Sequence, residues 1–384
     1  MRQLVPRRRL LEAIRVGLAE SPVVALLGAR QVGKTTLARL VAEAHREATV
    51  FDLERETGRA ALSVTPELAL RDARGLVVID EVQRMPSLFS LLRPLCDESE
   101  RNGRFLILGS ASPDVVRGIS ESLAGRVQFV AVPGFSVAEA GPANQDRLWL
   151  RGGFPRSFLS ATDDAAARWL MSFRETFVER DLPLLMPRVA PAALNRFWMM
   201  LAHYHGQVWN ASELARSMGV GPGTATQYRD MLAGMFMVRV LPPWHENVGK
   251  RQVKAPKVYL RDSGLLHSML GVSAMPELRA HPRYGASWEG FALEQTLIVH
   301  GDREAYFWAT HRGAELDLLL FRSGARVGFE FKCTDAPAPT RSMHIALEDL
   351  RLDHLYAVYP GVLRYRMGER ITALPLSELG TATA

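Results

Sequence analysis

Short apolar runs alternate with amphipathic stretches over roughly residues 21–132 of the chain. The apolar runs are 23–27, 76–79, 104–110 and 127–132. Runs of this length, bounded by turns, are typical of strands that are buried on both faces. Because amphipathic helices separate the runs, the pattern predicts a parallel sheet, and we expect residues 1–140 to form an α/β domain.

The pattern changes after residue 140. Residues 141–190 predict a helical linker segment with a turn at 152–155 and a helix at 169–181. Residues 191–262 predict three helices and then a strand pair: 195–204, 212–218, 224–232, 236–241 and 257–260. Three helices followed by a two-stranded wing, whose strands pair around the loop 245–256, predict a winged helix-turn-helix domain.

The last third, residues 263–384, predicts an α+β domain. Alternating strands at 315–321 and 326–332 flank a turn, and a helical pattern runs through 288–294. The chain of 384 residues is thus long enough for two or three domains, each with its own core.

The composition of the chain indicates which classes of protein and which kinds of site are to be expected. The chain is 47% hydrophobic and 23% charged, and no apolar run reaches the roughly 18 residues that span a bilayer. The first residues lack the apolar core of a signal peptide, and Cys96 and Cys333 are too few for a disulfide framework or a zinc site. We therefore expect a cytoplasmic protein with no membrane partner. A net charge of +6 favours a polyanionic partner such as DNA, although a general preference for arginine accounts for much of the excess.

Residues 28–36 carry the clearest chemical signal. The segment fits G-x-x-x-x-G-K-[ST] between an apolar strand and an amphipathic helix, which is typical of a loop that binds nucleotide phosphates. Its residues are the predicted ATP contacts: Gly28, Ala29, Arg30, Gln31, Val32, Gly33, Lys34, Thr35 and Thr36. We expect Lys34 to reach the β- and γ-phosphates and Thr35 to bind Mg²⁺. Lysine is scarce, with five in the chain at positions 34, 250, 254, 257 and 332.

Acids at the end of the next buried strand complete a predicted ATPase site. We expect Asp80 to join the Mg²⁺ shell and Glu81 to orient the water that attacks the γ-phosphate. Ser110 ends the following strand, where it is either a sensor of the γ-phosphate or a plain core residue. Arg126 is a candidate arginine finger that acts on a neighbouring subunit, so self-association is expected.

The winged-helix segment has two interpretations. If it binds DNA, its third helix presents Thr224, Thr226, Gln227 and Arg229 to the major groove, and the wing places Lys250, Arg251, Lys254 and Lys257 on phosphates. If it is scaffold, the helices pack on the ATPase domain and the basic loop is a solvated turn. Three of the five lysines lie in the wing, which favours contact with DNA.

The C-terminal strands carry a second group of charges. Asp317 lies on one strand, and Glu330 and Lys332 lie on one face of the next. Two carboxylates that share a Mg²⁺ beside a lysine are suited to phosphodiester hydrolysis, and Glu289 or Glu294 would add a helical acid. The alternative is an edge hairpin with solvated charges.

Taken together, these motifs resemble prokaryotic AAA-type ATPases that carry a C-terminal DUF4143 domain. The resemblance covers nearly the whole chain and rests on segments 28–35, 80–83, 123–126, 152–155, 177–181 and 315–332. It implies an AAA fold that uses ATP and a C-terminal domain of the PD-(D/E)xK restriction-endonuclease type, with Asp317, Glu330 and Lys332 in its motifs, although no proline precedes Asp317. The function expected is Mg²⁺-dependent ATP hydrolysis in action on DNA. The alternative is an ATP-gated signalling or defence switch whose nuclease-like domain is inert scaffold, with an unknown protein partner.

Overall fold

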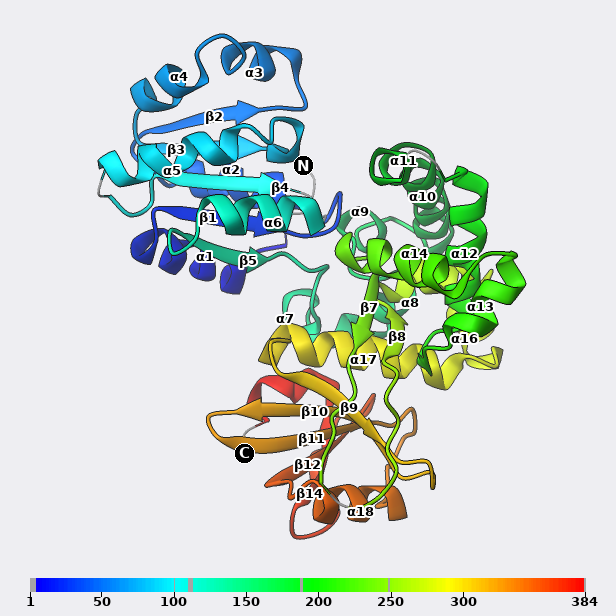
Figure 1. Cartoon of the computed structure of the whole chain (residues 1–384). Coiled ribbons are helices and arrows are strands. Elements are labelled where there is room, and N and C mark those ends of the chain that lie inside the picture. The colour runs from blue at the N-terminus through cyan, green and yellow to red at the C-terminus, as the bar shows by residue number, and fades with distance from the viewer. Residues whose placement is uncertain (1–4, 100, 110–112, 187–188, 248, 383–384) are drawn as a thin grey trace. The chain divides into compact units, whose positions relative to one another are not determined.

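The computed structural model describes residues 5–99, 101–109, 113–186, 189–247 and 249–382. The chain divides into two compact units. The first unit is residues 1–134 with 234–236, and the second is residues 135–233 with 237–384. Figure 1 labels the helices and strands of both units where there is room.

The first unit is built on a parallel sheet of five strands in the order β2-β3-β4-β1-β5 (Figure 1). The strands are β1 (Val23–Leu27), β2 (Ala48–Asp52), β3 (Leu76–Asp80), β4 (Phe105–Gly109) and β5 (Val127–Ala131). Its helices are α1 (Arg8–Glu20), α2 (Lys34–Glu43), α3 (Glu56–Ala61), α4 (Pro66–Asp72), α5 (Leu88–Ser99) and α6 (Pro113–Ser122). Every residue of β1, β3 and β4 is buried, as their uniformly apolar runs predict. The predicted α/β domain with a parallel sheet is confirmed.

The sheet order brings the two segments of the predicted phosphate site, 28–36 and 80–81, to the same end of the strands. β4 lies between β1 and β3 and pairs in parallel with both. The carboxyl ends of all three strands therefore lie along the same edge of the sheet. The segment that follows β1 and the acids that end β3 both lie on this edge.

The second unit begins with a helical segment rich in aromatic residues. Its helices are α7 (Val137–Ala140), α8 (Gln145–Arg151), α9 (Pro155–Phe158), α10 (Asp163–Thr176) and α11 (Leu182–Leu185), with a π-helical turn at Phe177–Asp181 between the last two. Phe173 stacks on both Trp169 and Phe177, with ring centroids 5.4 and 6.0 Å apart. These rings form the core between α10 and the helices around it.

Three helices and a small sheet follow, over the residues for which a winged helix was predicted. The helices are α12 (Pro191–His203), α13 (Ala211–Met218) and α14 (Pro222–Gly234). The sheet has the order β6-β8-β7 and contains β6 (Gln207–Val208), β7 (Val238–Leu241) and β8 (Lys257–Leu260). The predicted antiparallel pair is β7 with β8, and β6 is a strand that the sequence did not indicate.

The segment 242–256, which contains the loop 245–256 of the predicted wing, is bound to the C-terminal sheet. The Trp244 amide donates to the Phe307 carbonyl at 2.7 Å, and the Val253 amide donates to the Ala309 carbonyl at 2.9 Å. Both acceptors lie on β9 (Ala305–Ala309), the edge strand of that sheet. The loop therefore covers an exposed sheet edge, which a solvated wing would leave open.

The C-terminal part is a mixed sheet of six strands in the order β13-β14-β12-β11-β10-β9. Beyond β9, its strands are β10 (Glu315–Arg322), β11 (Ala325–Phe331), β12 (His354–Tyr359), β13 (Tyr365–Arg366) and β14 (Ile371–Pro375). Its helices are α15 (Ser263–Met269), α16 (Met275–Ala280), α17 (Tyr284–His300) and α18 (Arg341–Asp349). Met343 and Leu347 of α18 pack against Leu316 and Leu355 in one apolar core. In the part of the chain that is described, no helix is long and apolar enough to cross a membrane.

Candidate functional site

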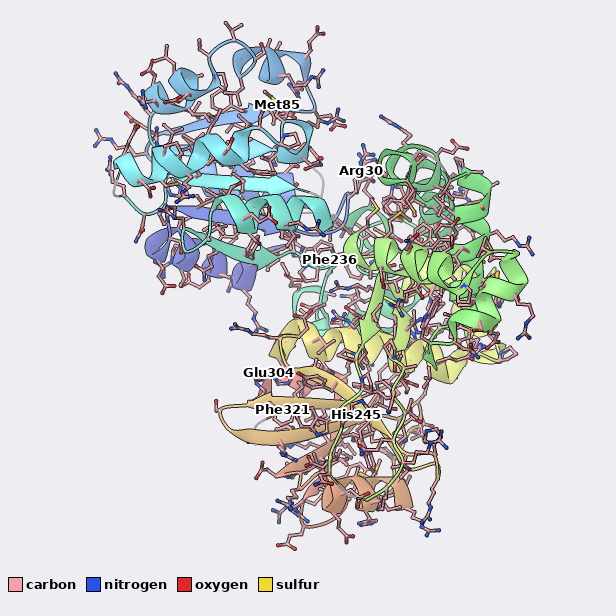
Figure 2. All side chains as sticks on the ribbon, in the orientation of Figure 1. Arg30, Met85, Phe236, His245, Glu304 and Phe321 are labelled. Carbon is pink, nitrogen blue, oxygen red and sulfur yellow. The ribbon has the colours of Figure 1, made fainter. Side chains whose placement is uncertain are left out.

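The loop 28–33 joins β1 to α2 in a tight backbone conformation. Gln31 has φ 61° and Gly33 has φ 102°, so the loop enters the left-handed region, which favours glycine, at two positions. At Gly28, a Cβ atom would lie 2.3 Å from the Val132 carbonyl oxygen. The glycines of the motif therefore fit the backbone geometry as well as the sequence pattern. Arg30, labelled in Figure 2, pairs with Glu54 at 3.4 Å.

Lys34 is held across this loop. Its Nζ donates to the carbonyl oxygens of Gly28 and Ala29, both at 2.9 Å, and only 6% of the residue is exposed. Burial lowers the pKa of Lys34, while the charges of Glu81 and Asp80 act in the opposite direction. The ammonium is thus fixed at the loop, beside acids from β3.

Asp80 ends β3 directly beside Thr35. The Glu81 amide donates to Asp80 Oδ1 at 2.9 Å. Burial is the largest influence and raises the pKa of Asp80, and the nearby Thr35 hydroxyl acts in the opposite direction. Mg²⁺ binds oxygen ligands and often takes only one or two from the protein. A hydroxyl and a carboxylate side by side at this loop therefore fit the predicted Mg²⁺ contacts of Thr35 and Asp80.

Glu81 has a strained backbone and a fixed side chain. Its φ of 56° lies in the left-handed region, which non-glycine residues rarely adopt. The Gln83 side-chain amide donates to the Glu81 carboxylate. This arrangement fixes the orientation of the Glu81 carboxylate, whose charge acts on Lys34.

Ser110 and Arg126 are the other two predicted ATPase residues. Ser110 lies outside the described residues. Arg126 binds Asp97 through two hydrogen bonds of 2.6 and 3.0 Å, and it directly precedes β5. The amino ends of the parallel strands lie opposite the loop edge, so Arg126 does not serve the loop of its own chain. Its role on a neighbouring subunit stays a prediction.

Arg7 is a loop contact that the sequence analysis missed. Its guanidinium donates to the carbonyls of Val32 at 3.4 Å, Pro133 at 2.9 Å and Gly134 at 2.9 Å. The side chain is buried, and it ties the phosphate loop to the segment after β5. Nothing in an arginine-rich sequence distinguishes this arginine from Arg8 or Arg9.

Two of the predicted DNA contacts need correction. Arg229 is largely buried, with its guanidinium 4.9 Å from the Trp209 ring and 2.6 Å from an Asp230 carboxylate oxygen, so it is not free to read a base. Lys257 is buried among carboxylates and cannot reach a phosphate. Lys250 is partly exposed, but its Nζ lies 2.6 Å from Asp349.

The remaining predicted DNA contacts are accessible to different degrees. Gln227, Arg251 and Lys254 are exposed, and Thr224 and Thr226 are partly exposed. The Thr226 hydroxyl donates to the Pro222 carbonyl at 3.1 Å. Contact of these five residues with DNA stays a prediction.

The C-terminal strands bring Asp317, Glu330 and Lys332 together. β10 and β11 pair with Leu318 opposite Phe329, and continuing this register places Asp317 opposite Glu330 on one face. The Phe331 amide donates to Asp317 Oδ2 at 3.0 Å, and Lys332 Nζ donates to Glu330 Oε2 at 2.7 Å. Burial, followed by the charge of Asp317, raises the pKa of Glu330 to about 8, against the opposing charge of Lys332.

The helical acid of this cluster is Glu289. Lys257 Nζ lies 3.1 Å from Glu289 Oε1, and the Tyr259 hydroxyl donates to the same oxygen at 2.6 Å. Glu294, the other candidate, instead binds Arg239 and Arg261. Within the described residues, no group of three or more His, Cys, Asp or Glu side chains is arranged to hold a metal ion.

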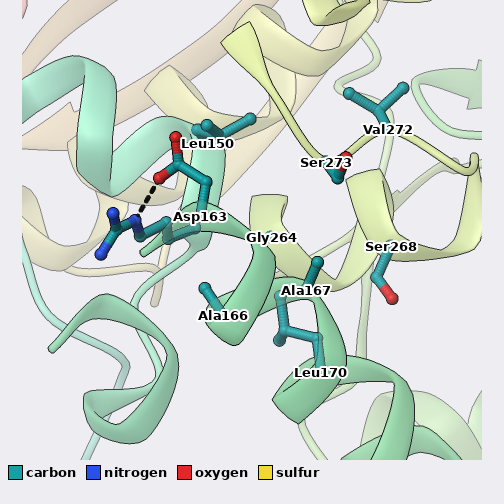
Figure 3. Close-up of a pocket in the computed structure, with 10 residues that line it drawn as sticks. Leu150, Asp163, Ala166, Ala167, Leu170, Gly264, Ser268, Val272 and Ser273 are labelled. Carbon is teal, nitrogen blue, oxygen red and sulfur yellow. Dashed lines mark hydrogen bonds and ion pairs between the residues drawn. The ribbon is translucent and has the colours of Figure 1, made fainter. Parts of the chain in front are cut away.

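A small hollow in the helical segment offers no room for a ligand (Figure 3). It lies among α8, α10 and α15, and Arg151 Nε donates to Asp163 Oδ1 at 2.5 Å beside it. Its cavity volume of about 10 Å³ is near the lower limit for one water molecule.

Three family models match successive parts of the chain. A family model described as an AAA domain matches residues 20–141, and one described as a domain of unknown function, DUF4143, matches residues 284–379. A third, the domain of unknown function DUF8612, matches residues 143–275. This third match spans both the predicted helical linker and the predicted winged-helix segment.

Relatives and solved structures were also found. The Walker-type ATPase PABY2304 of Pyrococcus abyssi is 15% identical, with a TM-score of 0.49 over 70% of this chain and 96% of that chain. RuvB of Thermotoga maritima is 14% identical, with a TM-score of 0.30 over 62% of this chain and 90% of that chain. The uncharacterised proteins Rv2008c of Mycobacterium tuberculosis and Mb2031c of Mycobacterium bovis are each 47% identical over 98% of this chain and 85% of their own length. The chain belongs to the same family as these two mycobacterial proteins and is a member with an AAA domain followed by a DUF4143 domain.

Proposed function

We propose that the protein binds ATP at the loop 28–35 and hydrolyses it with Mg²⁺. One observation carries this proposal: the buried ammonium of Lys34 donates to the Gly28 and Ala29 carbonyls at 2.9 Å, where the acids Asp80 and Glu81 act on its charge. A lysine and a hydroxyl at the start of one helix, with a carboxylate at the end of a neighbouring strand, are the groups that phosphoryl transfer uses to hold metal and phosphates.

Each residue has a distinct task in this proposal. The amides of the loop and of the first turn of α2 bind the phosphates, and Lys34 moves from the loop carbonyls to the β- and γ-phosphates. Thr35 and Asp80 would hold Mg²⁺, which supplies positive charge that stabilises the transferred phosphoryl group. Glu81 accepts a hydrogen bond from the attacking water, and Gln83 keeps the Glu81 carboxylate oriented.

The test is to separate nucleotide binding from turnover. Glu81→Gln keeps the shape of the side chain and removes its charge, so ATP binding should persist while hydrolysis falls roughly 10²- to 10⁴-fold. Glu98→Gln is the matched control, because Glu98 pairs with Arg71 on the surface of the same unit. Wild-type turnover in Glu81→Gln would contradict the assignment, as would a wild-type protein that hydrolyses no ATP.

A second candidate function is an ATP-gated switch whose C-terminal domain does not cleave DNA. The observation that favours it is the buried ammonium of Lys257 among the carboxylates of that domain. On this proposal, the wild-type chain leaves plasmid and linear DNA intact in Mg²⁺ while it hydrolyses ATP. Cleavage that Asp317→Ala abolishes would contradict it.

A further proposal is that the protein contacts DNA. It is supported by the exposure of Arg251 and Lys254 in the loop 242–256 and of Gln227 on α14, together with the net charge of +6. Phosphate contacts of this kind give affinity that does not depend on base sequence and falls with salt. A stable complex with DNA at moderate salt would support the proposal, and its absence would leave the ATP-gated switch.

A further inference from the structure

Lys257 is an unusual lysine because its charged end is buried among acids of a helix and of another sheet. It begins β8, and only 4% of the residue is exposed. Its Nζ lies 3.1 Å from Glu289 Oε1 and 3.7 Å from Asp317 Oδ1, and it also pairs with Glu315. Carboxylates from α17 and β10 thus surround one ammonium group.

The strand that carries Lys257 delivers a second donor to the same cluster. Tyr259 lies two residues further along β8, on the same face of the strand, and its hydroxyl donates to Glu289 Oε1 at 2.6 Å. The Phe307 ring of β9 lies 5.7 Å from Lys257 Nζ. A long apolar stem and two aromatic rings therefore enclose the ammonium and shield it from bulk water.

The backbone of β10 directs the Asp317 side chain towards the Lys257 ammonium. Between Leu316 and Leu319 the pairing of β10 with β9 shifts register, which marks a β-bulge around Asp317. Bulges change the direction of a side chain. The Asp317 carboxylate consequently has one oxygen on the Phe331 amide and the other towards Lys257.

A divalent cation at this cluster would compete directly with Lys257. Mg²⁺ and Mn²⁺ need oxygen ligands at about 2.1 Å, and a cation bound to Asp317 Oδ1 would lie within a few ångströms of a fixed ammonium. The described side chains include no ready-made group of metal ligands. Lys332 satisfies the fourth carboxylate, Glu330, in the same manner.

We propose that Lys257 is the resident cation of the cluster formed by Glu289, Glu315 and Asp317, and that it closes this cluster to divalent metal ions. The lysine joins the β6-β8-β7 sheet to the C-terminal sheet through these ion pairs. A metal site forms only when the ammonium is removed. This inference concerns a site separate from the nucleotide loop and does not depend on ATP hydrolysis.

The test is a titration of the full-length protein with Mn²⁺ alone, followed by the electron paramagnetic resonance signal of free Mn²⁺. Lys257→Met should gain one Mn²⁺ per chain, and the double variant Lys257→Met, Asp317→Asn should lose it again. The wild type, the single variant Asp317→Asn and the control Lys250→Met should give the same titration curve, because Lys250 pairs with Asp349 outside the cluster.

Two results would overturn the proposal. One is Mn²⁺ binding by the wild type that disappears in Asp317→Asn, since the site would then accept metal with Lys257 in place. The other is a Lys257→Met protein that folds, by circular dichroism, and gains no Mn²⁺. If Lys257→Met does not fold, Lys257→Gln makes the same comparison, because glutamine keeps hydrogen bonds to the acids without the charge.

Discussion

Lys34→Ala should weaken ATP binding less than it slows hydrolysis, for a reason visible in the structure. Lys34 Nζ already donates two hydrogen bonds of 2.9 Å to loop carbonyls, and contact with phosphates requires it to leave them. A hydrogen bond to a charged group is worth about 1.5–3 kcal/mol, and the two bonds to the loop carbonyls, which already have a charged donor, offset part of what the phosphate contacts contribute. The net loss of binding should therefore be about 2–3 kcal/mol, or roughly 30- to 150-fold in Kd.

Turnover depends on charge that develops in the transition state, so its loss should be larger. Removing one group that stabilises such charge costs roughly 10²- to 10³-fold in kcat. The assay is single-turnover hydrolysis of radiolabelled ATP together with a fluorescent-nucleotide titration. Arg39→Ala, an exposed residue on the same helix that pairs with Glu43, is the control and should match the wild type. A Lys34→Ala protein with wild-type turnover would refute the role of the loop.

Three further predictions concern other parts of the chain. Arg126→Ala should lower kcat roughly 10³-fold with ATP binding intact, and mixing it with Glu81→Gln should restore some activity; full activity in a dilute monomer would contradict a finger in trans. Neutralising Arg251 and Lys254 together should lower the log–log salt slope of DNA binding by about two, whereas an unchanged slope would remove them from the contact. Burial, with the charge of His267, lowers the pKa of His205 to about 3. His205 of the unfolded state therefore takes up a proton as the pH falls below about 6.5, whereas the buried His205 of the folded state stays neutral. This difference favours unfolding at lower pH. Between pH 7 and pH 5, the free energy of unfolding measured with urea should fall by about 2 kcal/mol more for the wild type than for His205→Gln. Equal losses would show that His205 is not buried in its neutral form.

The phosphate loop was predictable because its information is local. A short segment with fixed spacing between a strand and a helix determines where its backbone amides lie, and Asp80 follows from the end of one buried strand. The sheet order that brings β3 to the loop edge depends on pairing between distant segments, but the predicted parallel sheet left few alternatives.

The contacts of individual charged residues were not predictable in the same way. Glu289 and Glu294 are five residues apart on α17, hence about 140° around the helix, and the sequence does not say which side faces Asp317. Lys257 resembled its neighbours Lys250 and Lys254 in a basic loop. Its burial depends on the pairing of β8 with β7 and on the position of the C-terminal sheet, which no local pattern encodes.

Arg229 illustrates the same limit for the predicted DNA-reading helix. Its position on α14 matched a recognition helix, but the Trp209 ring that covers its guanidinium comes from a residue 20 positions earlier. The loop 245–256 was likewise predicted as part of a wing because the strand-like runs 236–241 and 257–260 flank it. Its backbone hydrogen bonds to β9 join segments that are far apart in the sequence.

The most direct test of the central claim is the release of phosphate from ATP by the full-length protein, with Mg²⁺ and with the metal chelated, for the wild type and Asp80→Asn. This substitution keeps the shape of the side chain while removing the charge that Asp80, beside the Thr35 hydroxyl, offers to Mg²⁺. The account predicts Mg²⁺-dependent release by the wild type and a loss of roughly 10²-fold or more in Asp80→Asn. Release that is independent of Mg²⁺, or equal in the two proteins, would contradict it.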